Sequence, residues 1–504
     1  MNSRLQAIRE LFPFSQTHPD KTAAEVRDRL DSVSGLSSYE VVVELTLHVI
    51  PSIVKQPNLH SRFKLLEETL EEAEKALPVL DRHIDYSELP LPHAATTSAL
   101  AADNLIKKLA SGYHGIATDI SAGTGAADLG RLLQRSIRRA MTLIARRQQL
   151  AYRTYAKPSA SSWLMLHDLY RMARNYHRRM PDESIAHVEH LYLSSLLLAY
   201  LEPGKLARND LPAAIFCTQQ LARHAQVSDV TPETKTVPRG TAGFLVRPEE
   251  GNAGTPLHRL VPGTPIASGM LIDCARVLEA IEKSAKRSPE EAPEPELGIS
   301  QNLLHTLQIA ISGKSTRRFD RKRFQPRADL VGGIAQVIPF LEGSAHSRRF
   351  DDSSAHNGQR AFVPSEWSLI DQSPDGFLVR FMQGDKWRVG IGNIIALQPR
   401  ESGKVHVCLV RRIATTTQGL LELGLQMLSP EVSVIELPGH AERRRGICLH
   451  SLPGHGGRPG VIARPGHLAS GHKLRLVGNQ LWMVGRRIEG SEGLEIFTLL
   501  PLPG

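Results

Sequence analysis

The sequence KRFQPR, residues 322–327, places basic side chains at a spacing that suits a small anion. Arg323 and Arg327 stand four residues apart, and Pro326 between them excludes a regular helix. A guanidinium group can grip phosphate oxygens, or the O6/N7 edge of guanine, through two parallel hydrogen bonds, and it can stack on a base. With Lys322 beside them, the two arginines form a candidate arm that closes around a phosphorylated ligand.

A second candidate stretch, DQSPDG, occupies residues 371–376 and connects the strand-like segments EWSLI and FLVRF. Asp371 can accept hydrogen bonds from the N1/N2 edge of guanine, and the hydroxyl of Ser373 can bond a phosphate or a base. Gly376 permits a turn or a close backbone approach that a side chain would block. The types and order of these residues therefore predict one half of a nucleotide site, with the arm as its other half.

Together the two stretches resemble the PilZ domain, the bacterial receptor module for cyclic di-GMP, whose signature is an RxxxR arm followed by a [D/N]xSxxG strand motif. The matching residues are Arg323 and Arg327 in the arm and Asp371, Ser373 and Gly376 in the strand motif, with Lys322 where many members carry another basic residue. The resemblance implies a six-stranded β-barrel over which the arm folds. It also implies that these residues contact the phosphates and guanines of cyclic di-GMP, a regulatory ligand and not a cofactor.

The chain departs from the PilZ pattern in two respects. Residues 343–362 stretch the distance between the two motifs, and we expect them to be an inserted polar loop. Arg317 and Arg321 offer a second RxxxR, but Arg323 and Arg327 are preferred because they lead directly into ADLVGGIAQVI. Downstream, residues 388–399, 404–414 and 421–428 look like the later strands of the family, with Gly424–Gln426 as its frequent Gly-hydrophobic-Gln ending.

Hydrophobic periodicity predicts a multidomain α+β chain. We expect an all-α domain, a PilZ-like six-stranded antiparallel β-barrel and a small C-terminal β unit, an architecture similar to large proteobacterial proteins with a long uncharacterised N-terminal region and a C-terminal PilZ module. The expected boundaries are a helical domain at 1–230, a mixed α/β segment attached to it at 231–285, a Pro/Glu-rich linker at 286–298, helix, arm and barrel at 299–435, and the β unit at 436–504.

Composition restricts the remaining possibilities. The net charge of +9 favours an anionic partner. Four cysteines without CxxC spacing indicate buried apolar residues, and neither a metal site nor a catalytic grouping is predicted. The longest nearly apolar run, residues 191–201, is shorter than the roughly 20 residues that cross a bilayer, and no signal peptide precedes it. We therefore expect a cytoplasmic protein without membrane insertion that is not an enzyme and needs no cofactor.

The predicted function is that of a cyclic di-GMP-binding signalling effector, in which ligand binding changes contacts between domains or with a protein partner of the helical domain. One alternative is a degenerate PilZ-like scaffold that does not bind the nucleotide. A less favoured alternative is a nucleic-acid-binding protein, which would use the arm and a helix rich in arginine. The arginines of that helix are Arg131, Arg135, Arg138, Arg139, Arg146 and Arg147, and a solvated helix face is the preferred interpretation of them.

Overall fold

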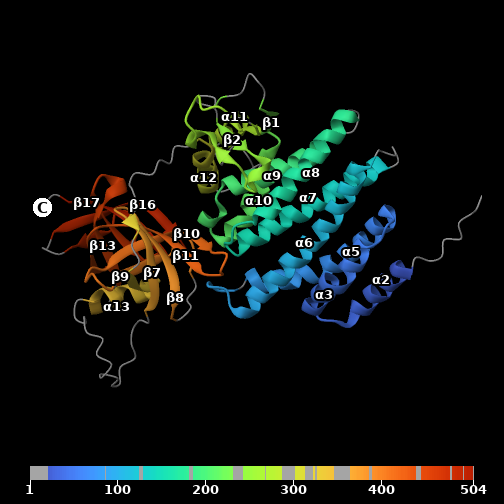
Figure 1. Cartoon of the computed structure of the whole chain (residues 1–504). Helices are drawn as coiled ribbons and strands as arrows, with labels where there is room; N and C mark the ends of the chain where they lie inside the picture. Colours follow the sequence, from blue (N-terminus) through green and yellow to red (C-terminus); the bar gives the residue numbers. More distant parts are fainter. Residues whose placement is uncertain are drawn as a thin grey trace, which may run out of the picture.

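Apolar residues at three- and four-residue steps build a layer of long helices in the first half of the chain (Figure 1). The computed structural model describes residues 21–85, 87–123, 129–180, 185–230, 236, 242–266, 268–286, 301–312, 322–323, 326–344, 364–384, 389–438, 444–476, 480–491 and 493–502. The expected linker at 286–298 and the expected insertion at 343–362 lie almost wholly outside these ranges. Helices first and β-sheets later confirm the predicted α+β architecture.

The helices share one hydrophobic core, in which α5, α6 and α7 run side by side. Their bounds are α2 (Lys21–Ser32), α3 (Ser38–Glu44), α4 (Ile50–Val54), α5 (Leu59–Asp85), α6 (His93–Ala122), α7 (Gly130–Arg153), α8 (Ala160–Arg179), α9 (Ala186–Tyr200) and α10 (Leu211–Ala222). The nearly apolar run at residues 191–201 is typical of a buried helix, and in the second half of α9 every residue from Tyr192 to Leu198 is buried.

Several arginines of α7 form ion pairs with carboxylates of the neighbouring helices. On α7 and α5, partners recur every seven residues, a spacing that keeps side chains on one face of a helix. The pairs are Arg139 with Glu67 at 2.7 Å, Arg146 with Glu74 at 3.4 Å and with Asp81 at 3.7 Å, and Arg153 with Asp81 at 3.0 Å and with Asp85 at 2.6 Å. Arg147 pairs with Asp103 of α6 at 2.7 Å. The face of α7 toward α5 and α6 is therefore an ion-pair ladder, while Arg131 and Arg138 are exposed, as expected for a solvated helix face.

A small antiparallel sheet follows the helices and packs on them. It consists of β1 (Gln226–Asp229), β2 (Gly243–Val246), β3 (Thr255–Pro256) and β4 (Met270–Asp273) in the order β1-β4-β2-β3, and α11 (Ala275–Lys286) follows it. The buried imidazole of His167 joins the two layers, since its Nδ1 lies 2.8 Å from the Tyr192 hydroxyl and its Nε2 lies 2.8 Å from the Asn252 carbonyl oxygen. Helix α12 (Gln301–Ser312) also buries its apolar residues in the helical core, although the sequence groups it with the barrel.

The predicted six-stranded antiparallel barrel is present and closed. Its strands are β6 (Arg327–Gly332), β7 (Ser365–Ser373), β8 (Gly376–Gln383), β9 (Ile394–Pro399), β10 (His406–Thr415) and β11 (Leu421–Met427), paired in the cycle β6-β7-β8-β11-β10-β9-β6. Alternate residues such as Trp367, Val379 and Leu423 fill the interior. Helix α13 (Ile334–Ser344) was not predicted; it begins directly after Gly333, whose φ of +81° ends β6.

The C-terminal β unit covers one side of the barrel. It is an open six-stranded antiparallel sheet of β12 (Val432–Glu436), β13 (Arg445–Leu452), β14 (Arg458–Ala463), β17 (Leu494–Pro501), β16 (Leu481–Ser491) and β15 (Lys473–Arg475), in that spatial order. An apolar cluster joins this sheet and α13 to outward-facing residues of β6, β9 and β10, among them Val331, Ile394 and Leu409. The outer surfaces of β7, β8 and β11 contribute no residue to that cluster.

The helical part packs against the barrel on a different side from the C-terminal unit. Tyr155, just after α7, and Leu89, between α5 and α6, belong to the hydrophobic core of the barrel. The backbone N–H of Thr415 donates to the Tyr155 carbonyl at 2.8 Å, and the Thr415 hydroxyl donates to the Thr154 carbonyl at 2.9 Å. Helices and barrel are therefore joined by buried apolar and hydrogen-bonded contacts in addition to the covalent chain.

Candidate functional site

The two motifs predicted from the sequence lie beside each other on the barrel. Strand β5 (Lys322–Arg323) and strand β6 both run antiparallel to β7, so that Arg323 pairs with Asp371 and Arg327 pairs with Ser368. Between these pairs, the N–H of Leu369 donates to the Pro326 carbonyl at 2.9 Å. The described parts of the arm, residues 322–323 and 326–327, thus lie along β7, with one arginine position at the acid of the strand motif. The side chains of Lys322 and Arg323 lie outside what the structure describes.

The strand motif forms the tight turn between β7 and β8. Ser373 pairs with Gly376 across a turn made by Pro374 and Asp375, and the Ser373 hydroxyl donates to the Gly376 carbonyl at 3.4 Å. A Cβ atom on Gly376 would lie 1.9 Å from the carbonyl oxygen of Leu425 in β11. The absence of a side chain at Gly376 is therefore required for β8 to pair with β11, independently of any ligand.

Asp371 belongs to a row of outward-facing positions that crosses three strands of the barrel wall. Paired residues of an antiparallel sheet share a face, and the register aligns Asp371 with Leu378 of β8, Leu378 with Gly424 of β11, and Gly424 with Arg412 of β10. Their neighbours Phe377, Val379, Leu423, Leu425 and Ile413 are buried in the barrel core. The row therefore has the acid Asp371 at one end and Arg412 at the other. Between them lie Leu378 and Gly424, which form a flat apolar surface that we call the shelf.

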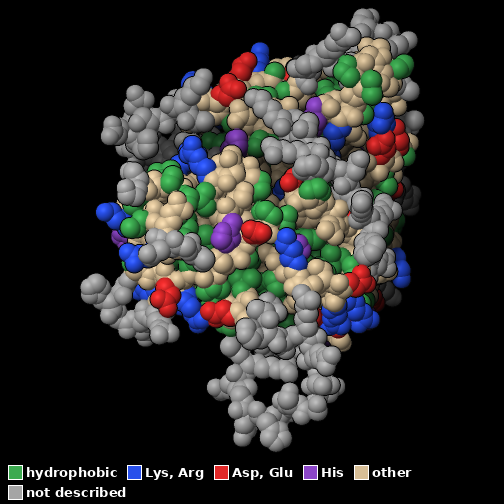
Figure 2. Space-filling view, turned by 90° about the vertical axis from the view of Figure 1, so that its left-hand side faces the viewer, with side chains coloured by type: hydrophobic (Ala, Val, Ile, Leu, Met, Phe, Trp, Pro, Cys, Tyr) green, Lys and Arg blue, Asp and Glu red, His purple; other side chains and the backbone are tan. Residues whose placement is uncertain are grey.

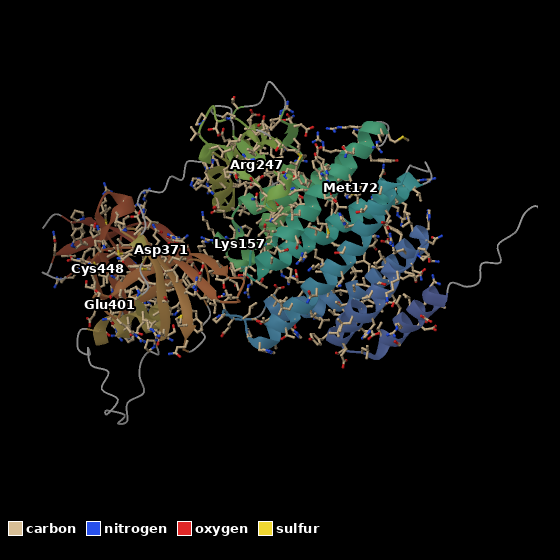
Figure 3. All side chains as sticks on the ribbon, in the orientation of Figure 1. Lys157, Met172, Arg247, Asp371, Glu401 and Cys448 are labelled. Carbon is tan, nitrogen blue, oxygen red and sulfur yellow. The ribbon has the colours of Figure 1, made fainter. Side chains whose placement is uncertain are left out.

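Arg327 begins a second outward row, in which Ser368, Arg380 and Glu422 follow on β7, β8 and β11. Arg380 donates to Glu422 at 2.7 Å, and Arg327 is the arginine through which the arm joins this row. Figure 3 labels Asp371 on the wall that carries both rows. The wall thus presents positive groups on either side of the shelf.

Arg327 forms an ion pair with Glu366 of β7. Glu366 also accepts from Gln383 at 3.0 Å and from Arg400 at 3.1 Å. The hydrogen bond from Gln383 and the charges of Arg400 and Arg327 lower the pKa of Glu366 below its usual value, although burial opposes them. The carboxylate is therefore ionised at neutral pH and holds the second arginine of the arm.

A β-bulge in β10 turns two successive arginines outward at the edge of the shelf. The register between β10 and β11 shifts between Val410 and Arg412, so that Arg411 has no partner of its own on β11. Arg411 donates to Gln426 at 2.7 Å and to Glu489 of the C-terminal unit at 2.6 Å. Arg412 is exposed on the other side, beside the helical part. The two residues thus connect the candidate site to both neighbouring units.

The structure brings the backbones of all six predicted site residues to one wall, and it adds others that the motifs do not contain. Arg380, Arg400 and Arg412 were missed, because their strands were predicted without a register. Alternating burial along β8 could have placed Arg380 outward, but no local signal marks the bulge that exposes Arg412.

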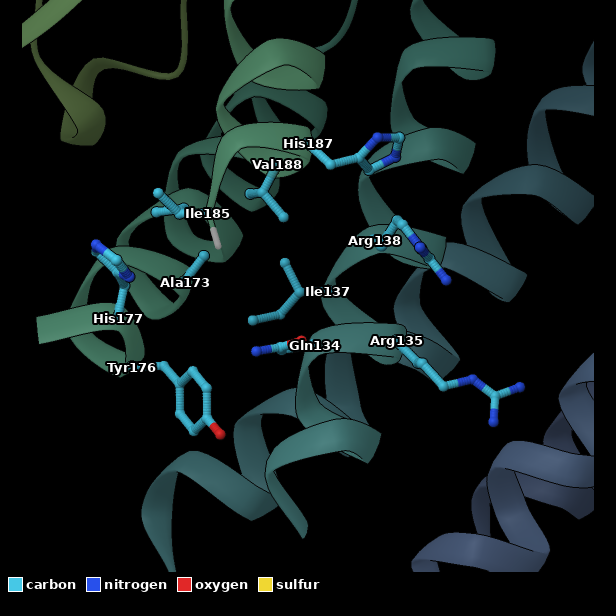
Figure 4. A pocket seen from close by; sticks show the side chains of 10 residues that line it. All are labelled: Gln134, Arg135, Ile137, Arg138, Ala173, Tyr176, His177, Ile185, His187 and Val188. Atoms are coloured by element: carbon cyan, nitrogen blue, oxygen red, sulfur yellow. The ribbon is translucent and has the colours of Figure 1, made fainter. Parts of the chain in front are cut away.

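The helical part holds a cavity of about 130 Å³, whose lining includes Arg138, His177 and His187 (Figure 4). Ile137, Ala173 and Val188 give it apolar walls. Arg135 contributes to its lining, but its guanidinium points away and lies 4.6 Å from the ring centre of Phe63 on α5. Among the described residues, no cluster of three or more His, Cys, Asp or Glu could hold a metal ion, and the four cysteines are buried thiols as predicted.

Comparison with known proteins adds independent information about the helical part. Residues 24–233 match the family model of the N-terminal domain of the cyclic-di-GMP receptor FimW. The chain is also 27% identical over 466 residues to the cyclic-di-GMP receptor FimW of Pseudomonas aeruginosa, an alignment that covers 78% of this chain and 73% of the relative. The similarity therefore extends well beyond the helices into the β-rich half.

The described helices also bear on the membrane expectation. None of them combines the length and the apolar character needed to cross a bilayer.

Proposed function

We propose that this chain is a cyclic di-GMP receptor of the PilZ type that acts as a signalling effector and not as an enzyme. The backbone register of β5 and β7 carries the proposal, because it aligns Arg323 of the arm with Asp371 of the strand motif. The similarity to the cyclic-di-GMP receptor FimW of Pseudomonas aeruginosa supports it.

The chemistry of the wall suits a cyclic dinucleotide. Arg323 and Arg327, with Lys322, would bind phosphates or the O6/N7 edge of guanine. Asp371 would accept from the N1/N2 edge of a guanine, and the Ser373 hydroxyl would bond a phosphate or a base. Gly376 would let the ligand approach the backbone of the turn. In this arrangement the arm closes over a ligand that lies on the outer surface of the barrel.

A receptor of this kind signals by changing the population of two arrangements. The arm lies on the same wall as Arg412, which adjoins the helical part, so an arm ordered by ligand can alter how helices and barrel contact each other. A protein partner of the helical part would sense this change. A pull-down with the full chain should recover a partner to different extents with and without cyclic di-GMP.

Calorimetric titration of the full chain with cyclic di-GMP tests the proposal, with cyclic di-AMP and GTP as controls for specificity. Arg323→Ala and Arg327→Ala should each weaken binding by about 5- to 150-fold, the range expected for loss of a bidentate contact. Arg458→Ala, which removes an exposed arginine of the C-terminal unit, should leave binding unchanged. If the wild type does not bind cyclic di-GMP, or if neither arm variant changes the affinity, the result would favour the scaffold alternative.

Binding to nucleic acid is less well supported by the structure. Four of the six α7 arginines that such binding would use form ion pairs with Glu67, Glu74, Asp81 or Asp103. On the face drawn in Figure 2, coloured basic and acidic side chains stand next to one another. Steeply salt-dependent binding to oligonucleotides would contradict this conclusion.

A further inference from the structure

Arg412 occupies the far end of the shelf that begins at Asp371. Three strand spacings of about 4.8 Å separate the two positions along the row, a span of roughly 14 Å across the barrel wall. The positions between them are Leu378, which is half-buried, and Gly424, which has no side chain. A planar base or a sugar can lie on such a surface with polar groups at both of its ends.

Gly424 has a structural role in this arrangement. A Cβ atom at this position would lie 3.0 Å from the Cβ atom of Arg412, so a larger residue would push against the base of the arginine side chain. The absence of a side chain at Gly424 therefore keeps the shelf flat and leaves Arg412 room to reorient. Arg412 itself is exposed and forms no hydrogen bond or ion pair within the described part of the chain.

A segment of the helical part approaches Arg412 from the side opposite the shelf. The short 3-10 turn η4 (Pro203–Lys205) packs on β10, and a Cβ atom on Gly204 would lie 2.7 Å from the Ile413 carbonyl oxygen and 3.9 Å from Cγ of Arg412. Glu202 directly precedes this turn. It forms ion pairs with Lys205 and, at 3.6 Å, with Arg259.

Glu202 and Arg412 interact through their charges. Burial raises the pKa of Glu202, but the hydrogen bond and charge of Lys205, together with the charges of Arg259 and Arg412, bring it below the usual value. Glu202 is thus an ionised carboxylate whose direct partners are Lys205 and Arg259, and its charge acts on Arg412 without an ion pair between them. A ligand anion on the shelf would attract the same guanidinium toward the barrel wall.

We propose that Arg412 is a further ligand-binding residue, which contacts a phosphate or the second guanine of the dinucleotide, and that Glu202 competes for it when the site is empty. This inference rests on the proposed function. Binding of the ligand then draws the Arg412 side chain, which forms no ion pair with Glu202, toward the barrel wall and loosens the contact between η4 and β10. The arm site is connected in this way to the helical part through one arginine.

Titration of the full chain with cyclic di-GMP tests the binding role. Arg412→Gln should weaken binding by about 12- to 150-fold, the effect of losing a charge-assisted contact, and Arg412→Lys should recover part of the loss. Arg475→Gln, an exposed arginine in β15, is the matched control, because it removes the same charge without touching the wall. If Arg412→Gln binds cyclic di-GMP as tightly as the wild type does, the inference is wrong.

A double-mutant cycle tests the competition. Glu202→Gln should tighten binding by about 2- to 5-fold, the effect of removing a nearby opposite charge in an exposed region, and this gain should disappear in the Arg412→Gln background. An equal gain in both backgrounds would overturn the competition. Hydrogen exchange gives a second readout, since the amides of Lys205 and Leu206 should exchange faster with ligand in the wild type and not in Arg412→Gln.

Failure of this inference is distinguishable from failure of the proposed function. A wild type that does not bind cyclic di-GMP would reject both. Binding that depends on Arg327 but not on Arg412 would reject only the role of Arg412.

Discussion

Arg327 of β6 and Glu366 of β7 form an ion pair at the point where the arm joins the barrel. The two side chains differ in exposure to solvent: 10% of the Glu366 side chain is exposed, compared with 59% of the Arg327 side chain. Gln383 and Arg400 also fix the carboxylate. Glu366 is therefore a permanent part of the wall, and Arg327 is the partner that can leave it. A ligand phosphate must compete with Glu366 for Arg327.

Removing the charge of Glu366 should therefore strengthen ligand binding. In Glu366→Gln the side chain keeps its size and a carbonyl oxygen that can accept from Gln383, but it attracts Arg327 less. We expect cyclic di-GMP to bind about 2- to 5-fold more tightly in calorimetric titration, the contribution of an ion pair with one exposed partner. Glu436→Gln in β12 should have no effect. Weaker binding by Glu366→Gln would instead mean that the carboxylate orients Arg327 for the ligand.

The glycine of the strand motif leads to a second prediction, which concerns stability. Gly376→Ala would place a Cβ atom 1.9 Å from the Leu425 carbonyl oxygen, so β8 and β11 must separate locally. We expect the free energy of unfolding to fall by about 2 kcal/mol or more, as measured by denaturant titration. If Gly376→Ala also binds the ligand less tightly, the cause would be the local separation of β8 and β11.

Gly454→Ala is the matched control for Gly376→Ala. A Cβ atom at Gly454 meets no atom within 4 Å, and this residue lies in a short 3-10 turn of the C-terminal unit. Its unfolding free energy should stay within about 0.5 kcal/mol of the wild type. Equal stability of the two variants would refute the close approach at Gly376.

Much of this architecture could be predicted from the sequence because it follows from local periodicity. The buried second half of α9 and the short apolar strands of the barrel are examples, and the two motifs predicted which strands form the candidate site. Helix α13 was missed, since Gly333 turns a run of residues that looks like a continuing strand into the first turn of a helix.

The register of the barrel could not be predicted, and Arg412 shows why. Strict alternation along KVHVCLVRRIA would place Cys408, Val410 and Arg412 on one face, with Arg412 inside the barrel. The bulge at Arg411 adds one residue, so that Ile413 follows Val410 into the core and Arg412 turns outward. This shift depends on pairing with β11, a contact that no local pattern encodes.

Tyr155 leads to a third prediction, about the joint between helices and barrel. Its ring is 6% exposed and packs in the barrel core, and its hydroxyl donates to the Leu206 carbonyl at 3.1 Å. Tyr155→Ala removes the largest side chain that the helical part inserts there. We expect calorimetric unfolding to separate into two transitions, because cooperativity between the two parts depends on this contact. Tyr39→Ala, at an exposed tyrosine of α3, should leave the unfolding profile unchanged, and a single transition in Tyr155→Ala would contradict the prediction.

A fourth prediction concerns the pH dependence of stability and rests on His167. Burial is the main cause that lowers the pKa of His167, while the hydrogen bond to the Asn252 carbonyl opposes this effect. The imidazole is therefore neutral in the folded protein, whereas in the unfolded chain it takes up a proton near pH 6.5. Because the unfolded state binds more protons in this range, the free energy of unfolding falls as the pH drops below about 6.5.

The expected slope from this histidine is at most about 1.4 kcal/mol per pH unit, between the pKa of the unfolded chain and the lower pKa of the folded protein. His167→Gln should remove this part of the slope, because glutamine does not titrate, even if it lowers stability at every pH. Denaturant titrations between pH 7.5 and pH 5 measure the difference. His93→Gln, at an exposed histidine that begins α6, should keep the slope of the wild type. Identical slopes for His167→Gln and the wild type would show that the buried imidazole does not resist protonation.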